Sequence, residues 1–336
     1  MSLVRKLLFP ISILYYIFQF SRNKLFDINF FDITEFKIPT ICVGNLSLGG
    51  SGKTPLVNYI INNYKSELKI AFLSRGYNRN SSGYLHVDET KNVEEVGDEP
   101  FLIKKNHKNL IVSVSEDRVK GINHTIKKFK GIQLFVLDDA FQHRKLKCSL
   151  NIVLSKFDEP FYSDCIFPVG NLREPQAGIK RANIIIITKC PYNLDTYKKN
   201  SILKKINPSI NQKVFFSTII YDIFLIGKIK IKINELFNKS IILVTGIADS
   251  SSLENYLLSK NIFFRHIKFN DHHKYSKSDI NHIKSISSKM VVLTTKKDYY
   301  KIRSIEKLDN LYYQDINIKF LENEEVFNSE IKKILK

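Results

Sequence analysis

Two kinds of apolar pattern, one strand-like and one helix-like, follow each other along residues 26–212. Short, nearly uninterrupted runs of Ile, Val, Leu and Phe recur, and helix-like segments stand between them, as at 54–65 and 116–129. Uninterrupted β-branched runs are typical of parallel strands buried on both faces, so we expect a mostly parallel sheet covered by helices on both faces. Ligands of such sheets bind at the carboxyl ends of the strands. The predicted strands lie within residues 38–45, 68–77, 109–115, 132–144, 150–157 and 182–190.

The pattern changes near residue 213. Apolar and polar side chains alternate on both sides of Gly227, which predicts a β-hairpin. Four strand-like runs with helical segments between them follow, which predicts a second, smaller α/β domain. The expected parts are an N-terminal segment, a larger domain, a hairpin connector and a smaller C-terminal α/β domain, at residues 1–25, 26–212, 213–235 and 236–336.

The N-terminal segment is strongly apolar. Residues 7–21 carry no charge, are rich in aromatic side chains and include Pro10 and Gln19. A spanning helix needs about 20 apolar residues, so this run is too short, and it lacks the small-residue cleavage site that a signal peptide requires. Its composition favours a helix that lies in the membrane interface, and the alternative is a helix packed on the protein's own core. The basic flanks are Arg5, Lys6, Arg22 and Lys24.

Glycine is concentrated in one turn. Four of the 13 glycines fall between Gly44 and Gly52, after a predicted strand and before a predicted helix. Because glycine permits positive φ and close approach of a ligand, this turn is predicted to be a phosphate-binding P-loop rather than a turn without a ligand. Lys53 would reach the β- and γ-phosphates and the Thr54 hydroxyl would bind Mg²⁺, although Ser47 stands where the usual pattern has glycine. The predicted phosphate-binding residues are Ser47, Leu48, Gly49, Gly50, Ser51, Gly52, Lys53 and Thr54.

Two acidic residues end the predicted strand within 132–144. Asp138 and Asp139 follow four apolar residues, as in the strand that carries the metal-binding carboxylate of P-loop proteins. One of them would hold Mg²⁺ opposite Thr54, and the pattern does not distinguish between the two. These features predict a P-loop NTPase-like domain as the larger of the two domains.

Three functions other than that of an ATP-dependent kinase can be compared with the motifs of this sequence. Residues 295–298, Thr-Lys-Lys-Asp, resemble a guanine-reading motif, but Ala140 and Gln142 stand where a GTPase switch would have its pattern. A metallochaperone-type ATPase would cluster Cys or His ligands, and the cysteines here are scattered. A structural membrane protein with a degenerate nucleotide site would not need the intact Lys53 and Thr54.

The formal net charge is +19, which favours an anionic partner such as nucleic acid, an acidic membrane surface or a phosphorylated substrate. The four cysteines show no Cys-x-x-Cys spacing, so we interpret them as reduced thiols of a cytosolic protein.

Eight motifs, in this order and spacing, resemble the tetraacyldisaccharide 4′-kinase family, the lipid A 4′-kinases. The resemblance extends from the N-terminal segment to about residue 300. This sequence departs from the family pattern at 248–250, Val169 and Asn171. The motifs are GNLSLGGSGKTP (44–55), LSRGY (73–77), VGDEP (96–100), LDDAFQHRKL (137–146), FPVGNLREP (167–175), VTGIADS (244–250), FNDHHKYS (269–276) and TTKKD (294–298).

The resemblance implies transfer of the γ-phosphoryl of ATP, with Mg²⁺, to the 4′-hydroxyl of a tetraacylated glucosamine disaccharide 1-phosphate, giving lipid IVA. The implied partners are this anionic glycolipid and the cytoplasmic leaflet of the bacterial inner membrane, with no nucleic acid and no stable protein partner. The implied location is the cytoplasmic face of that membrane, as a peripheral or monotopic protein.

The resemblance also assigns roles to single residues. It implies that Asp98 acts as the base toward the acceptor hydroxyl with His272 as its partner, while Lys53, Asp138 and Asp139 complete the catalytic set. An imidazole beside a carboxylate can orient it and tune its pKa. The candidates for binding the glycolipid headgroup are Asn45, Arg75, Tyr77, Gln142, His143 and Arg173.

Overall fold

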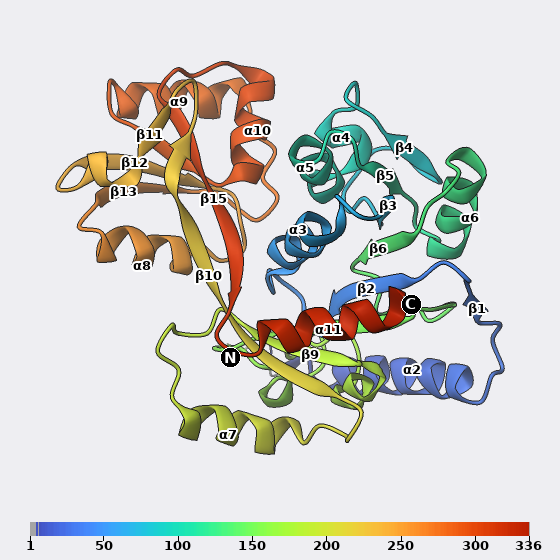
Figure 1. Cartoon of the computed structure of the whole chain (residues 1–336). Helices are drawn as coiled ribbons and strands as arrows, with labels where there is room; N and C mark the ends of the chain where they lie inside the picture. Colours follow the sequence, from blue (N-terminus) through green and yellow to red (C-terminus); the bar gives the residue numbers. More distant parts are fainter. Residues whose placement is uncertain (1–4, 6, 336) are drawn as a thin grey trace. The chain divides into compact units, whose positions relative to one another are not determined.

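The computed structural model describes residue 5 and residues 7–335, which form two units. Unit 1 comprises the chain up to Ile219 and from Ile318 onward, and unit 2 comprises Ile220–Asn317. The chain leaves unit 1 within the long strand β10 (Lys213–Ile226) and returns to it within β15 (Leu311–Phe320) (Figure 1). Of the expected N-terminal segment, residues 1–4 and 6 lie outside the described residues.

Unit 1 is built on a mostly parallel sheet in the order β10-β9-β8-β2-β6-β3-β5-β4, and β4 alone of these runs antiparallel to its neighbour. A separate parallel pair, β1 and β7, lies outside this sheet. The strands are β1 (Thr34–Glu35), β2 (Thr40–Asn45), β3 (Ile70–Ser74), β4 (Leu85–Val87), β5 (Ile111–Val114), β6 (Leu134–Asp138), β7 (Leu146–Lys147), β8 (Leu150–Lys156) and β9 (Ile184–Thr188).

Helices cover both faces of this sheet, as the uninterrupted apolar runs predict. Along β2, Ile41 and Val43 pack into one core, whereas Cys42 between them packs into the other, because successive side chains of a strand point to opposite faces. Helices α3, α5 and α11 contribute to the first core, and α6, α7 and η2 to the second. The helices of unit 1 are α2 (Phe9–Asp27), α3 (Lys53–Tyr64), α4 (Val93–Val96), α5 (Asp98–Asn106), α6 (Arg118–Lys128), η1 (Phe161–Ser163), η2 (Gln176–Arg181), α7 (Thr196–Ile206) and α11 (Glu324–Leu335).

Unit 2 is a smaller α/β unit with the parallel order β13-β12-β14-β15, and β11 pairs antiparallel with the end of β10. This pairing provides the hairpin expected around Gly227. The further elements are β11 (Lys230–Lys232), η3 (Ile233–Leu236), β12 (Ser240–Thr245), α8 (Ser251–Ser259), β13 (Phe263–Lys268), α9 (Lys277–Ser287), β14 (Val292–Thr294) and α10 (Lys296–Ile305).

The C-terminal helix differs from its expected place. Sequence analysis assigns residues 236–336 to the smaller domain, but α11 packs into the core of unit 1. The Phe327 ring is fully buried and meets the Phe215 ring edge-on, with centroids 5.5 Å apart. Tyr59 of α3 donates to Glu324 at 2.7 Å. Helix α11 belongs to unit 1 because β15, which precedes it, ends beside β10 in that unit. The apolar face of α11 then packs against the sheet of unit 1.

We expect Phe327→Ala to lower the free energy of unfolding of unit 1 by about 3–5 kcal/mol, because it leaves a cavity in a packed aromatic cluster. The adjacent Val326 is 43% exposed on the same helix, so Val326→Ala is the matched control and should change stability by less than about 0.5 kcal/mol. Urea unfolding of the two variants checks this. Equal effects would show that α11 does not contribute to the core.

Candidate active site

The carboxyl ends of five neighbouring strands in unit 1 carry polar side chains. Because these strands are parallel, their carboxyl ends meet at one edge of the sheet, where a ligand is expected. The last residues of β2, β3, β6, β8 and β9 are Asn45, Ser74, Asp138, Lys156 and Thr188.

The glycine-rich turn has the backbone of an anion-binding loop. Gly49 and Gly52 have φ values of 94° and 88°, in the left-handed region that favours glycine. Helix α3 then begins at Lys53 with no acidic residue in its first turn, and no side chain among the described residues caps its N-terminus. Its first N–H groups are thus left for an anion, as the sequence predicts.

The Lys53 ammonium lies among polar groups of the same edge. Its Nζ donates to Asn45 Oδ1 at 3.0 Å and lies 3.4 Å from Asp139 Oδ1. Asn45 also donates to the Ser47 carbonyl at 2.5 Å and is almost fully buried. Asn45 therefore takes part in the hydrogen bonding of the P-loop, and its expected role as a headgroup ligand stays a prediction.

The two adjacent aspartates occupy contrasting environments. Asp138 is 5% exposed, and burial raises its pKa to about 7, although nearby Lys53 opposes this. Burial also disfavours the charge of Asp139, but Lys53 and Arg173 outweigh it and lower the pKa of Asp139 to about 2. Arg173 Nη1 donates to Asp139 Oδ2 at 2.7 Å. Asp139 is therefore paired with two cations, while Asp138 receives one long hydrogen bond, from Ser74 Oγ at 3.4 Å.

Two of the headgroup candidates, Arg75 and Tyr77, have exposed side chains. Gln142 Nε2 donates to the Asn45 carbonyl at 2.9 Å. Burial, reinforced by Arg118, lowers the pKa of His143 to about 4, so this imidazole is neutral near pH 7.

Two buried charged residues that the sequence analysis did not identify bond to residues of this site. Arg118 donates to the Asp139 carbonyl at 3.0 Å and to the Asp138 carbonyl at 3.4 Å. Glu174, which is 2% exposed, accepts from Gln142 at 3.0 Å and pairs with Arg181. Glu174 lies within the motif FPVGNLREP, but a local pattern does not reveal the partners of a buried carboxylate.

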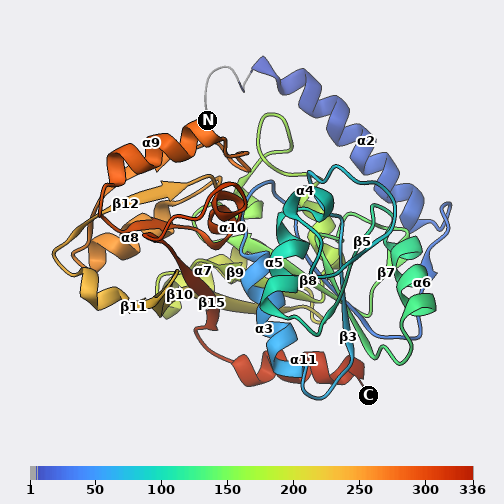
Figure 2. The ribbon, with the colours of Figure 1, turned by 90° about the horizontal axis from the view of Figure 1, so that it is seen from above.

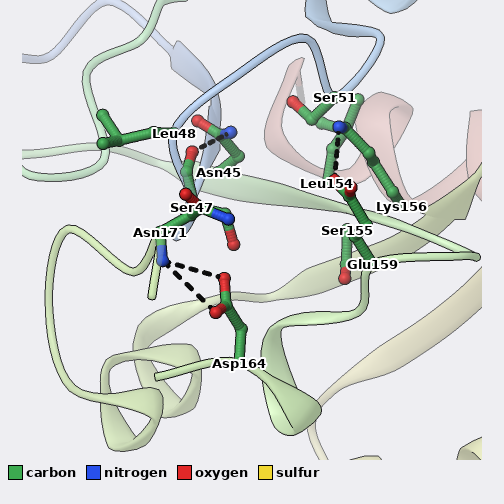
Figure 3. Close-up of a pocket in the computed structure, with 10 residues that line it drawn as sticks. All are labelled: Asn45, Ser47, Leu48, Ser51, Leu154, Ser155, Lys156, Glu159, Asp164 and Asn171. Atoms are coloured by element: carbon green, nitrogen blue, oxygen red, sulfur yellow. Dashed lines mark hydrogen bonds and ion pairs between the residues drawn. The ribbon is translucent and has the colours of Figure 1, made fainter. Parts of the chain in front are cut away.

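A small cavity lies on the β8 side of the P-loop (Figure 3). Its volume is about 10 Å³, roughly the space for one water molecule. Lys156 points toward this side of the loop and is paired with Glu159 at 2.7 Å, and Ser51 Oγ has no hydrogen-bond partner among the described residues. The cavity is too small to hold a nucleotide.

Helix α2 runs along the outside of unit 1 (Figure 2). Its polar side chains anchor it: Ser12 Oγ donates to the Ile166 carbonyl at 3.2 Å, and Tyr15 Oη donates to the Arg173 carbonyl at 2.8 Å. Among the described residues, no helix has the length and apolar character needed to cross a membrane. The large apolar side chains of this segment that are exposed are Leu7, Phe9, Ile11, Ile13, Leu14, Tyr16, Ile17, Phe18 and Phe20.

Asp98 and His272 lie in different units. Asp98 is buried at the first position of α5, after Gly97 with a φ of 91°. His272 in unit 2 has a φ of 55°, and its Nε2 lies 3.9 Å from Asp271 Oδ1. Their pairing stays a prediction.

The guanine-reading interpretation of residues 295–298 is not compatible with the structure. Asp298, which would have to reach the base, is 0% exposed and accepts hydrogen bonds from Gly246 N and Thr295 Oγ1. In the described part of the chain, no group of three or more His, Cys, Asp or Glu side chains converges in a way that could hold a metal ion.

This chain is similar to known tetraacyldisaccharide 4′-kinases. The family model described as tetraacyldisaccharide-1-P 4′-kinase matches residues 4–336. A tetraacyldisaccharide 4′-kinase of Flavobacterium johnsoniae is 38% identical over 337 residues, covering 100% of this chain and 98% of the relative. One from Flavobacterium psychrophilum is 39% identical over 334 residues, covering 98% of this chain and 97% of the relative.

A solved structure is also similar to this chain. The crystal structure of LpxK from Aquifex aeolicus in complex with ATP matches with a TM-score of 0.80 at 31% identity, covering 99% of this chain and 100% of its own. Because both the family model and full-length relatives match nearly every residue, this chain belongs to the tetraacyldisaccharide-1-phosphate 4′-kinase family.

Proposed function

We propose that this chain carries out the reaction for which its family is named. It transfers the γ-phosphoryl of ATP to the 4′-hydroxyl of tetraacyldisaccharide 1-phosphate, giving lipid IVA in lipid A biosynthesis. The observation that carries the proposal is Lys53 at an uncapped helix N-terminus beside Asp138 and Asp139, in a chain that matches the family along its length. The direct test is to mix the purified protein with ATP, Mg²⁺ and the disaccharide 1-phosphate and to detect the added phosphoryl group by mass spectrometry.

The P-loop amides of residues 47–54 hold the triphosphate, with Lys53 on its β- and γ-phosphates. The oxygen atoms that Lys53 contacts in the structure, Asn45 Oδ1 and Asp139 Oδ1, support this role, because phosphate oxygens can take the place of these acceptors around the ammonium.

Asp138 and Thr54 are the residues that would hold Mg²⁺. The fit rests on Asp138, which is buried and has a raised pKa. Among the described residues it has no cationic partner as close as those of Asp139. A site with few protein ligands suits this ion, which keeps waters and phosphate oxygens in its shell. When bound, Mg²⁺ neutralises charge on the transferring phosphoryl group. Asp139 instead positions Lys53 and Arg173.

The acceptor hydroxyl needs a proton acceptor as it attacks, and Asp98 takes that role with His272. The exposed side chains of Arg75 and Tyr77 bind the headgroup. Gln142, His143 and Arg173 bond within the protein and support the headgroup site.

The protein works at the cytoplasmic surface of the inner membrane, where the acyl chains of its substrate lie. Two observations support this location: the exposed apolar side chains of α2 and the net charge of +19. A helix with one apolar surface and basic flanks binds an anionic interface by burying those side chains and by electrostatic attraction.

Lys53→Ala should lower kcat by at least about 10²–10³-fold, because it removes a charge that stabilises the transferring phosphoryl group. Lys65 directly follows the same helix α3 as its C-cap residue and bonds to Asn62, so Lys65→Ala is the matched control and should keep normal kcat. Steady-state kinetics and circular dichroism check both variants. A folded Lys53→Ala protein with near-normal kcat would contradict the P-loop assignment.

Replacing exposed apolar side chains of α2 with charged ones should release the protein from membranes and leave the nucleotide site intact. Leu14 and Phe18 are 69% and 64% exposed and stand four residues apart, on one side of the helix. Leu14→Glu/Phe18→Glu should abolish sedimentation with anionic vesicles and leave the affinity for ATP unchanged. Ile210 is 94% exposed elsewhere in unit 1, and Ile210→Glu should still sediment. Retained sedimentation of the double variant would rule out α2 as the membrane contact.

The Asp98–His272 pairing makes a kinetic prediction. Asp98→Asn and His272→Ala should each lower kcat by about 10²–10⁴-fold, the range of general acid–base catalysis. Because residues that act as a unit are not additive, the double variant should be little slower than the slower single variant, and the KM for ATP should hardly change. Losses that multiply in the double variant would show that the two residues act independently.

A further inference from the structure

Three motifs of unit 2 meet at the carboxyl edge of its sheet. Gly246 follows β12, His272 follows β13, and Asp298 lies in the first turn of α10, which follows β14. These three strands are parallel neighbours, so their ends lie at the same edge. We propose that Asp298 is a positioning residue for His272, acting through the backbone of Gly246. This inference rests on the proposed role of His272 in deprotonating the acceptor.

Asp298 is bound to the backbone by its buried carboxylate. It is fully buried, and its Oδ2 accepts from Gly246 N at 3.0 Å and from Thr295 Oγ1 at 2.7 Å. A buried carboxylate is costly unless it is hydrogen-bonded. The cost is visible in the pKa of Asp298, which burial raises although the Gly246 N–H opposes the shift. If Asp298 served only to cap the N-terminus of α10, its carboxylate could do so while exposed to solvent.

Gly246 connects this carboxylate to His272. The Gly246 carbonyl accepts from His272 N at 3.1 Å, while its own N–H is held by Asp298. A Cβ at this position would lie 2.9 Å from Asp298 Oδ1 and 3.2 Å from the Tyr275 hydroxyl. The absence of a side chain therefore permits the close approach of the Gly246 backbone to Asp298.

His272 needs such a support. Its φ of 55° lies in the left-handed region, which L-residues adopt at a cost and keep only where surrounding bonds hold them. The bond from His272 N to Gly246 is one such restraint. The imidazole is 23% exposed, so it can meet a ligand while its backbone is fixed. Since displacement by about 1 Å can cost about 10²-fold in rate, the loss of this restraint should act on catalysis.

The test is a double-mutant cycle of Asp298→Asn and His272→Ala in the full-length protein, with Mg²⁺, ATP and the disaccharide 1-phosphate. Asp298→Asn alone should lower kcat by about 10- to 100-fold with the KM for ATP unchanged. In the His272→Ala background it should cause no further loss. Hydrogen exchange of peptides spanning 244–250 and 270–276 should accelerate in Asp298→Asn, because the Gly246 and His272 amides lose protection.

Two further variants serve as a control and as a substitute for Asp298→Asn. Asp279 caps α9 and bonds to His273 rather than to Gly246, so Asp279→Asn is the matched control and should keep kcat within about twofold, as substitutions outside the restraint should. If Asp298→Asn does not fold, Gly246→Ala disturbs the same contact from the other side and should show the same masking by His272→Ala.

The outcomes separate the two proposals. If His272→Ala keeps normal kcat, the proposed catalytic role of His272 is wrong, and the positioning inference is overturned with it. If His272→Ala is slow but the loss from Asp298→Asn multiplies with it, the role of His272 stands and the inference about Asp298 is overturned. An equal loss of kcat in Asp279→Asn would also overturn it, because the effect would then be general to unit 2.

Discussion

The arrangement of the nucleotide edge depends on one interaction, the pairing of Asp139 with both Lys53 and Arg173. An ammonium at the start of a helix lies beside partial positive charge, so it needs a negative partner. Asp139 provides one, 3.4 Å from the Lys53 ammonium, and its backbone has a left-handed φ of 50°. The same carboxylate holds Arg173, so the start of α3 is connected to the loop that carries Arg173.

A second set of buried bonds extends from this edge to the surface helix. Glu174 accepts from Asn23 of α2 at 3.2 Å and from Gln142 at 3.0 Å, and Gln142 in turn donates to the carbonyl of Asn45. A buried carboxylate that loses a donor is left unsatisfied, which costs more than the net value of the bond. Helix α2 and the strand end before the P-loop are therefore held by shared donors within unit 1. The helix proposed to meet the membrane is part of the nucleotide-binding unit and not a flexible appendage.

Local pattern was sufficient to predict much of this fold. The run Ile184–Thr188 is uninterrupted because its strand is buried on both faces, and glycine marks the two left-handed positions of the P-loop. What the pattern did not reveal depends on contacts between distant residues. Phe327 meets Phe215, and Asp298 meets Gly246. An isolated motif such as Thr-Lys-Lys-Asp contains no signal of burial, so its aspartate could equally have been a surface ligand for a base.

The contrast between Asp138 and Asp139 follows from geometry and not from residue type. Asp138 is buried and Asp139 is half-buried. Asp139 lies within ion-pair distance of two cations, whereas Asp138 receives a weak hydrogen bond from Ser74. Burial raises the pKa of Asp138 to about 7, because it disfavours the charged form of this carboxyl. A cation bound beside it would favour the charged form. Of the two adjacent carboxylates, Asp139 is thus the one with close cationic partners in the described part of the chain, and its neighbour Asp138 is the proposed Mg²⁺ ligand.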